Sequence, residues 1–371
     1  MGCCSLPEID WTAFEEYLYN KARSKRIPLS ANLELTHRCN LRCVHCYVAC
    51  HNNYNKKLFS KKSIAQMEMK THEIYRIIDQ LVDEGTLYLT LTGGEPLVRE
   101  DFEQIYRYIK MKGLLVTLLT NGTLFTEKLY NLLSELPPKA IEITIYGITE
   151  KTHESITKVP GSFQKTMSNV DKLVGKNFNL KLKTIVMRLN KHELEGMKDF
   201  AKNLAIPFKY SALIFPHLSK SKVTYKCRLS AQQVARYDIE DPERRAAWQV
   251  LLKMSPSDTN DINGCYLYHC NAASVSFWID PYGKLSACHL ARFPNYDLVQ
   301  GNFKEGWYDF LFHHIRLKKL DTPTECTKCK LRTICDQCPG WAQLENKNEW
   351  KKGDYLCEVA HLRAEGFGVP D

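Results

Sequence analysis

The chain of 371 residues has no hydrophobic run long enough to cross a membrane. A membrane-spanning helix needs about 20 consecutive apolar residues, and no stretch comes near that length. The opening residues, MGCCSLPEID, also lack the apolar core of a secretory signal peptide. Residue 6 is Leu, whereas an N-myristoylation motif needs Ser or Thr there. We therefore expect a cytoplasmic protein that has no membrane partner.

Acidic residues are in short supply: 42 Asp and Glu stand against 51 Lys and Arg, which gives a formal charge of +9. Such an excess can indicate nucleic-acid binding, but it counts every cysteine as neutral. If most of the 15 cysteines are metal-bound thiolates, their negative charge offsets much of the excess. We therefore predict no nucleic-acid partner. With 44% hydrophobic and 25% charged residues, the composition is that of a folded protein and excludes a disordered one.

Cysteine is the residue type that the chain has in excess. In the reducing cytoplasm, 15 cysteines indicate metal ligation rather than disulfides. The densest group lies in LTHRCNLRCVHCYVAC, where Cys39, Cys43 and Cys46 follow the spacing C-x3-C-x2-C and Cys50 comes next. Three thiolates on one loop can hold three corners of an iron–sulfur cubane and leave the fourth iron open to another ligand. The alternative is a closed structural zinc site in which Cys50 supplies the fourth ligand.

Residues 31–215 alternate short apolar runs with amphipathic segments. The six apolar runs are 31–35, 87–91, 114–119, 140–146, 180–187 and 208–215. Apolar residues at helical spacing predict helices at about 71–85, 102–112, 126–135, 162–176 and 192–204. Strand–helix alternation of this kind makes parallel βαβ units with right-handed crossovers. We therefore predict an α/β fold, a partial (β/α)6 barrel of the TIM type, with its active site where the strands end.

Unusual residues follow the predicted strands directly. The first strand leads into the cysteine loop, and the second ends in TGGEP, Thr92–Pro96. The third ends in Thr-Asn-Gly at 120–122 and the fourth in Tyr-Gly at 146–147. The GGEP stretch places bare backbone and the carboxylate of Glu95 near the cysteine loop, which suits a ligand that carries an ammonium group. Its glycines could also serve only a tight turn that requires positive φ.

After residue 215 the alternation stops. We divide the chain into an N-terminal helical segment (1–30), the barrel (31–215), a connector (216–264) and a cysteine-rich domain (265–371). In the connector, DPERRAAWQVLLK predicts a helix that begins at an Asp-Pro pair. We expect the last domain to be organised around metal rather than around an apolar core, with a zinc ribbon as the alternative for CTKCKLRTICDQC. Its cysteines are Cys265, Cys270, Cys288, Cys326, Cys329, Cys335, Cys338 and Cys357.

The pairing of C-x3-C-x2-C with GGEP one strand later resembles the radical S-adenosylmethionine (SAM) superfamily, over about residues 31–214. The resemblance implies that Cys39, Cys43 and Cys46 ligate a [4Fe–4S] cluster whose open iron chelates SAM. Tyr146 departs from the pattern, because many relatives carry Asp there. The residues implied to contact SAM are His45, Gly93, Gly94, Glu95, Asn121, Thr144 and Asn190.

The C-terminal cysteine spacing resembles the SPASM extension of many radical SAM enzymes, except that two residues rather than three separate the last close pair. The resemblance implies two auxiliary [4Fe–4S] clusters, so that three clusters and SAM are the expected cofactors. One auxiliary cluster is expected on Cys326, Cys329, Cys335 and Cys357. The other is expected on Cys270, Cys288 and Cys338, with Cys265 as fourth ligand or an iron left open for substrate. His289 stands where sulfatase-maturing relatives carry an acidic residue, which argues against that activity.

The resemblance also implies a reaction: SAM is cleaved to a 5′-deoxyadenosyl radical, which removes a hydrogen atom from an unactivated C–H bond. We expect the substrate to be a ribosomally made precursor peptide that is crosslinked, epimerised or, as by spliceases, relieved of a tyramine equivalent. A separate small leader-peptide recognition protein and an electron donor such as flavodoxin or ferredoxin are the expected partners. The alternatives are a radical SAM enzyme for a small molecule or cofactor precursor, such as a tetrapyrrole, and a zinc-rich binding protein. The sequence does not identify a catalytic acid or base; Cys227 is either an ordinary thiol or a residue that donates a hydrogen atom or contacts the substrate.

Overall fold

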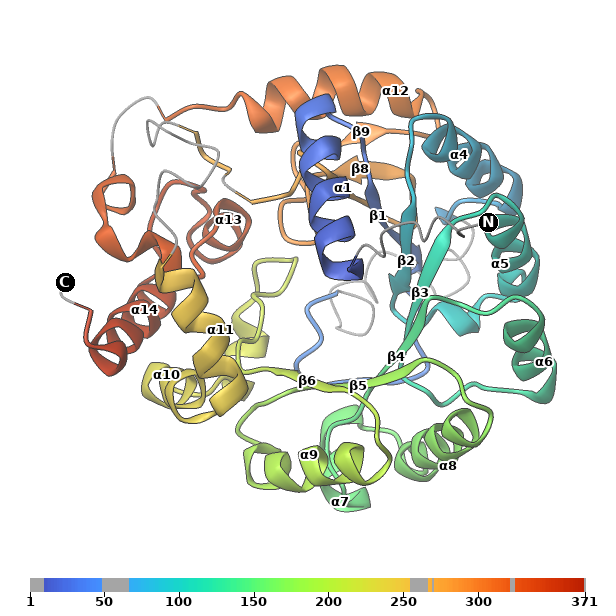
Figure 1. Cartoon of the computed structure of the whole chain (residues 1–371), viewed down its shortest axis with the longest axis horizontal. Coiled ribbons are helices and arrows are strands. Elements are labelled where there is room, and N and C mark those ends of the chain that lie inside the picture. Colours follow the sequence, from blue (N-terminus) through green and yellow to red (C-terminus); the bar gives the residue numbers. More distant parts are fainter. Residues whose placement is uncertain (1–9, 49–66, 254–265, 269, 321–323, 370–371) are drawn as a thin grey trace, which may run out of the picture.

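The computed structural model describes residues 10–48, 67–253, 266–268, 270–320 and 324–369, and Cys50 and Cys265 lie outside them. These described residues are built on one twisted sheet of nine strands in the order β6-β5-β4-β3-β2-β1-β7-β8-β9 (Figure 1). Within the described residues, no helix combines the length and the apolarity that a membrane span requires.

The first six strands run parallel, each hydrogen-bonded to the next. They are β1 (Ser30–Thr36), β2 (Tyr88–Gly93), β3 (Leu115–Thr120), β4 (Ala140–Thr144), β5 (Leu180–Ile185) and β6 (Phe208–Ser211). All six lie at the apolar runs of the sequence, because strands that are covered on one face by helices need an apolar residue at every second position. The predicted partial barrel is confirmed.

Helices cover the outer face of these strands (Figure 1). They are α4 (Thr71–Asp83), α5 (Phe102–Met111), α6 (Glu127–Glu135), α7 (Glu150–Thr157), α8 (Ser162–Gly175) and α9 (Leu194–Asn203). Alternate strand residues such as Leu33 and Leu118 pack with helix residues such as Ile77 in one core. Helix α7 was not predicted, because it has a single large apolar residue, Ile156; Thr149 caps its first turn instead.

The opposite face of the strands lines the interior of the barrel and carries several polar residues. Asn32, Thr90 and Thr117 lie side by side across β1, β2 and β3, as the strand register shows. Further round the barrel, the ammonium group of Lys183 on β5 is 3.2 Å from the carboxylate of Glu142 on β4. The interior therefore offers hydrogen-bonding groups and charges, together with apolar side chains such as that of Leu119, which pairs with Glu142 across β3 and β4.

The sheet continues without a break into the cysteine-rich part. Strand β7 (Ser276–Ile279) pairs with β1 in parallel, and β8 (Lys284–Ser286) and β9 (Tyr296–Asp297) follow antiparallel. Next come α12 (Phe303–Glu305) and the π-helix η5 (Gly306–Arg316). Phe277, Phe303 and Trp307 are buried in the same core as the barrel. The expectation that this part has little apolar core is therefore wrong for residues 276–315.

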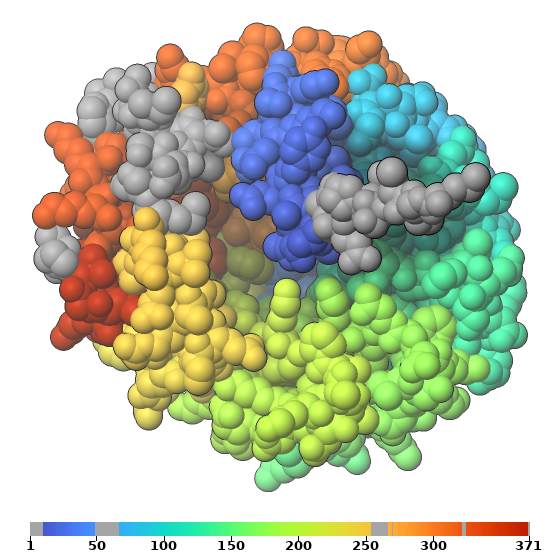
Figure 2. All heavy atoms as spheres, viewed as in Figure 1, coloured from blue at the N-terminus to red at the C-terminus, as the bar shows by residue number. Residues whose placement is uncertain are grey.

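The remaining described helices lie outside the repeat of β1 to β6. They are α1 (Trp11–Lys25), α10 (Ala231–Glu240), α11 (Pro242–Lys253), α13 (Pro339–Asn346) and α14 (Asp354–Phe367), with short 3-10 turns η1 (Pro96–Val98), η2 (Lys191–Glu193), η3 (Lys222–Cys227), η6 (Cys326–Lys328) and η7 (Lys330–Ile334). Helices α1 and α11 were predicted, and α11 begins at the Pro of the Asp-Pro pair. Figure 2 shows a hollow in the face between α1 and the yellow segment of α10 and α11.

Candidate active site

The loops that follow β1 and β2 are joined by main-chain hydrogen bonds. The amide of Gly94 donates to the carbonyl of Thr36 (2.7 Å), and the amide of Glu95 donates to that of Arg38 (2.9 Å). A Cβ atom on Gly93 would lie 2.2 Å from the Thr36 oxygen, and one on Gly94 would lie 2.3 Å from the Arg38 oxygen. Only glycine allows so close an approach. The two glycines therefore hold the GGEP stretch against the cysteine loop.

The three cysteines of the loop are electrostatic neighbours. Burial raises the pKa of Cys39 to about 12, and the charges of Glu95 and Cys46 contribute. Burial, together with Cys46 and Cys39, raises the pKa of Cys43 well above its usual range. Thiolates in this loop therefore need a compensating cation, which is what iron supplies when it displaces the protons. The donor set fits an iron–sulfur cluster.

A side-chain network fixes the cysteine loop to the end of β3. The amide nitrogen of Asn121 donates to Asn40 (2.9 Å) and lies 3.8 Å from the sulfur of Cys39. The amide nitrogen of Asn40 in turn donates to the hydroxyl of Thr123 (2.7 Å). The predicted site residue Asn121 is thus beside the cysteines, although its amide is engaged by protein groups. Asn40 and Thr123 were not predicted, because no sequence signal links residues 83 positions apart.

Glu95 is fully buried and bound on both oxygens. It accepts hydrogen bonds from the hydroxyl of Thr120 (2.8 Å) and from the amides of Asn121 (2.7 Å) and Leu97 (3.2 Å). Burial nevertheless raises the pKa of the carboxyl to about 7. A carboxylate has about four acceptor positions, so one is left for a ligand. In the described part of the chain no Lys or Arg pairs with Glu95, and a cationic ligand would supply the missing charge.

His45 lies against Tyr146 with ring centroids 5.0 Å apart. Burial lowers the pKa of this histidine to about 4, and its Nδ1 atom has no hydrogen-bond partner among the described residues. Tyr146, which departs from the expected pattern, is buried beside Cys43 and forms a hydrogen bond with it. The backbone amide of Tyr146 is 3.3 Å from Nδ1 of His153 on α7. Tyr146 therefore forms one side of the site, next to Cys43 and His45.

Thr144 and Asn190 lie at the ends of β4 and β5. Thr144 is the last residue of β4 and pairs with Lys183, on the inner face of the barrel. Asn190 is fully buried; its side-chain oxygen accepts from the amide of Met187 (2.8 Å), and its nitrogen donates to the carbonyl of Ile185 (3.1 Å). Asn190 therefore holds its own loop together. SAM contacts by these two residues stay predictions.

A buried ion pair joins β1 to the segment after Cys288. Arg292 donates to both carboxylate oxygens of Glu34 (2.7 and 2.8 Å), and His37 is 2.9 Å from the same carboxylate. Glu34 is only 1% exposed. Burial alone would raise the pKa of this carboxyl, but the hydrogen bonds from His37 and Arg292 lower it to about 2. The pair was not predicted, because its members are 258 residues apart in the sequence.

The C-terminal cysteines form two groups. Burial raises the pKa of Cys335 to about 11, with contributions from its neighbours Asp336, Cys326 and Cys329, and Cys357 is a neighbour of Cys329. Burial likewise raises the pKa of Cys338 to about 12, with contributions from Cys288 and Cys270. The structure thus places Cys326, Cys329, Cys335 and Cys357 together, and Cys270, Cys288 and Cys338 together. Cys265, the expected fourth member of the second group, lies outside the described residues.

Many of these sulfurs accept a hydrogen bond from a backbone amide two or three residues further on. The pairs are Leu41 to Cys39 (3.4 Å), Ala291 to Cys288 (3.3 Å), Leu331 to Cys329 (3.4 Å), Gln337 to Cys335 (3.5 Å) and Trp341 to Cys338 (3.3 Å). Amide donors stabilise thiolates and tune iron–sulfur clusters. Cys227 has no such bond among the described residues and packs in an apolar cluster with Met187 and Ile214.

A zinc site was the alternative for the cysteine loop, with Cys50, which lies outside the described residues, as a ligand. The four ligands of one zinc ion all lie about 2–2.3 Å from one point. In the described ranges, no three side chains of His, Cys, Asp or Glu form such a group. Cubane cysteines bind different iron atoms instead.

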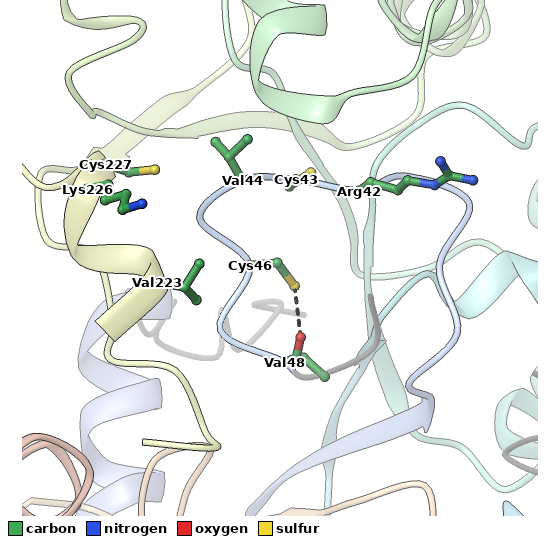
Figure 3. A pocket seen from close by; sticks show the side chains of 8 residues that line it. All are labelled: Arg42, Cys43, Val44, Cys46, Val48, Val223, Lys226 and Cys227. Carbon is green, nitrogen blue, oxygen red and sulfur yellow. Dashed lines mark hydrogen bonds between the residues drawn. The ribbon is translucent and has the colours of Figure 1, made fainter. Parts of the chain in front are cut away.

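A cavity of about 360 Å³ lies between the cysteine loop and η3 (Figure 3). Cys46 lies on the loop side, where its sulfur is 3.5 Å from the carbonyl oxygen of Val48. The cavity is lined by Arg42, Cys43, Val44, Cys46, Val48, Val223, Lys226 and Cys227.

Residues 33–201 match the model of the radical SAM superfamily. The AdoMet-dependent heme synthase of Methanosarcina barkeri is 27% identical, over 88% of this chain and 93% of that protein. The antilisterial bacteriocin subtilosin biosynthesis protein AlbA of Bacillus subtilis is 25% identical, over 91% of this chain and 74% of that protein. In fold, the chain is similar to Streptococcus suis SuiB bound to the precursor peptide SuiA, with a TM-score of 0.65, 16% identity, and coverage of 95% of this chain and 82% of that one.

Proposed function

Residues 33–201 match the radical SAM superfamily, and we propose that the chain is an enzyme of this superfamily that modifies a ribosomally made precursor peptide. Cys39, Cys43 and Cys46 would hold a [4Fe–4S] cluster, and the GGEP stretch would hold SAM beside it. Together these groups supply a carbon radical that can remove a hydrogen atom from an unactivated C–H bond.

The protein's own residues fix the position of both loops. Gly93 and Gly94 bring the GGEP stretch against the cysteine loop, and Glu95 locks it to the end of β3. The remaining acceptor position of Glu95 would receive the ammonium group of SAM. Tyr146 and His45, both buried, keep water away from one side of the site.

The auxiliary groups of cysteines would hold two further [4Fe–4S] clusters. The support is their grouping in space and the amide hydrogen bonds to their sulfurs. The Glu34–Arg292 pair joins β1 to the segment that follows Cys288, one of these cysteines. The two clusters could accept an electron from the substrate or bind it.

The polar interior of the barrel is the observation that carries the peptide proposal. A peptide backbone presents alternating hydrogen-bond donors and acceptors, and Asn32, Thr90 and Thr117 offer both in one row. The ion pair of Glu142 and Lys183 adds charges of both signs. The similarity to AlbA, a bacteriocin biosynthesis protein, favours the same substrate class. Crosslinking, epimerisation and splicease-type removal of a tyramine equivalent are the candidate modifications.

A tetrapyrrole is the second candidate substrate. It is favoured by the similarity to a heme synthase that spans nearly all of that protein's length. The interior lysine Lys183 could pair with a tetrapyrrole carboxylate. The large flat apolar face of a tetrapyrrole, however, has no counterpart in the polar row of residues on β1 to β3.

Partners follow from the proposed reaction. A peptide substrate would be delivered by a separate small leader-binding protein, and a flavodoxin or ferredoxin would supply electrons. We place the reaction in the cytoplasm, where the 15 cysteines stay reduced until they bind iron.

Anaerobic incubation of the reduced enzyme with SAM tests the proposal. Candidate precursor peptides and iron coproporphyrin are supplied in parallel reactions, and products are read by mass spectrometry. We expect a changed peptide: hydrogen loss for a crosslink, deuterium uptake from heavy water for epimerisation, or a large mass loss for excision. The variant with Cys39, Cys43 and Cys46 changed to Ala is the control and should leave every peptide unchanged. Conversion of the tetrapyrrole with inert peptides would favour the second candidate.

A further inference from the structure

A group of basic residues surrounds the cavity beside the cysteine loop. Lys226 and Val223, both exposed, come from η3 on one wall, and Arg42 comes from the cysteine loop (Figure 3). Lys222 begins η3 and is also exposed. The opening of the cavity is therefore basic with an apolar centre.

Two more cations stand on the same side. The backbone amide of Arg188 donates to the carbonyl of Cys227 (3.1 Å), and that of Arg42 donates to the carbonyl of Thr157, next to Lys158. The charges of Arg188 and Lys158 both act on the Cys227 thiol. We call this group the basic rim: Arg42, Lys158, Arg188, Lys222 and Lys226.

The basic rim gathers five exposed cations at one opening. Some exposed lysines elsewhere are paired, as Lys128 is with Glu103 (2.6 Å) and Lys352 is with Glu325 (2.7 Å). No ion pair involves the basic rim within the part of the chain that the structure describes. Unpaired charge of one sign raises the rate at which an oppositely charged protein associates.

The cavity connects the basic rim to the cysteine loop, because Cys43 and Cys46 are among the residues that line it. A group that these cysteines hold would therefore border the cavity that opens at the rim. Each radical SAM turnover begins with one electron from outside the chain. A basic rim around the cavity that Cys43 and Cys46 line suits an acidic protein donor.

We propose that the basic rim docks an acidic one-electron carrier protein of the flavodoxin class. The reduced carrier loses one electron, and the group held by Cys39, Cys43 and Cys46 gains it. Acidic side chains of the carrier pair with the basic rim, and an apolar part of the carrier's surface contacts Val223. The inference depends on superfamily membership and on the three cysteines, and it is independent of the peptide substrate.

The test uses the holoenzyme and a recombinant bacterial flavodoxin as the probe. The variant Lys222→Glu/Lys226→Glu reverses two charges of the rim. The control Lys25→Glu/Lys304→Glu makes the same change of net charge at two exposed lysines on α1 and α12. Calorimetry measures the Kd for oxidised flavodoxin, which requires no turnover. The rate of 5′-deoxyadenosine formation is measured with reduced flavodoxin and, separately, with dithionite.

We expect the rim variant to raise the Kd about tenfold at low salt, and the difference from wild type to shrink as salt screens the charges. The rate of 5′-deoxyadenosine formation by the rim variant with flavodoxin should also fall about tenfold, whereas its rate with dithionite should equal that of the wild type. The control variant should have the Kd and both rates of the wild type. An unchanged Kd would overturn the proposal, as would an equal loss of both rates. So would impaired peptide modification at a normal dithionite-driven rate, because the surface would then serve a substrate or its carrier. If the wild type modifies no peptide, the proposed function fails while the Kd comparison stands.

Discussion

Removing the guanidinium of Arg292 should destabilise the protein strongly, because it leaves Glu34 buried without its main counter-charge. Glu34 is 1% exposed and the Arg292 side chain is 11% exposed, so water cannot replace the lost bonds. Breaking one side of such a buried pair costs about 3–5 kcal/mol. Since His37 still contacts Glu34, we expect Arg292→Met to lower the free energy of unfolding by about 3 kcal/mol.

The double variant Glu34→Gln/Arg292→Met separates loss of the pair from loss of packing. It removes both charges, so we expect it to recover most of the stability that the single variant loses. Anaerobic urea unfolding at pH 7, followed by tryptophan fluorescence, measures the difference, with iron content per chain as a check that the clusters are retained. A cost below about 1 kcal/mol for Arg292→Met, or no recovery in the double variant, would refute the reasoning.

The pH dependence of the same pair has a definite sign. In the wild type the pKa of Glu34 is about 2, below its ordinary value of 4.5, so its stabilisation is present above pH 4.5 and is lost as pH falls toward 2. In Arg292→Met, burial raises the pKa of Glu34. Protonation of Glu34 as pH falls therefore removes the buried unpaired charge and restores part of the variant's stability. The stability gap between variant and wild type should therefore narrow from pH 7 to pH 5. A widening gap would contradict the assignment.

Three further predictions concern the loops around the site. Gly94→Ala should abolish SAM cleavage while iron is retained, because its Cβ would lie 2.3 Å from the carbonyl oxygen of Arg38; SAM binding and iron analysis measure both. Glu95→Gln should weaken SAM binding at least tenfold. Because ionising this buried carboxyl costs free energy, the wild type should lose stability as pH rises from 4.5 through 7, and the variant should lose less over that range. Arg363→Met should lower iron by about four atoms per chain, because Arg363 holds the carboxylate of Asp336 (2.8 Å) and the carbonyl before Cys335.

Matched variants serve as controls for these changes. Gly175→Ala places a methyl group where no atom lies within 4 Å, so it should leave SAM cleavage intact. Glu240→Gln and Arg236→Met alter an exposed ion pair and should leave SAM affinity and iron content unchanged. Normal SAM cleavage in Gly94→Ala, or unchanged iron in Arg363→Met, would show that the loops are positioned by other contacts.

Local patterns made the barrel predictable from sequence. The strands of a helix-covered sheet and the helices between them each carry their own periodicity, so β1 to β6 were found without knowledge of the fold. Helix α7 was not predicted, because Thr149 fixes its start and its only large apolar residue is Ile156, so it has no apolar periodicity. The pairing of β7 with β1 was not predicted either, because no local sequence pattern indicates that a short strand pairs with one about 245 residues earlier.

The candidate site was predictable to the extent that it consists of motifs. The cysteines and GGEP are short spacings, so they could be read directly. The contacts that hold them are long-range: Asn121 reaches Asn40 across 81 residues, and Arg292 reaches Glu34 across 258. Such pairs use common polar residues, and only the folded chain brings them together.

The most direct test of the central claim compares the wild type with the variant in which Cys39, Cys43 and Cys46 are all Ala. Iron, sulfide and 5′-deoxyadenosine are measured anaerobically after reduction with dithionite and addition of SAM. We predict about twelve iron atoms per chain and 5′-deoxyadenosine for the wild type, and about eight iron atoms with no 5′-deoxyadenosine for the variant. SAM cleavage by the variant, or zinc without sulfide in the wild type, would contradict the claim that this loop holds the cluster that acts on SAM.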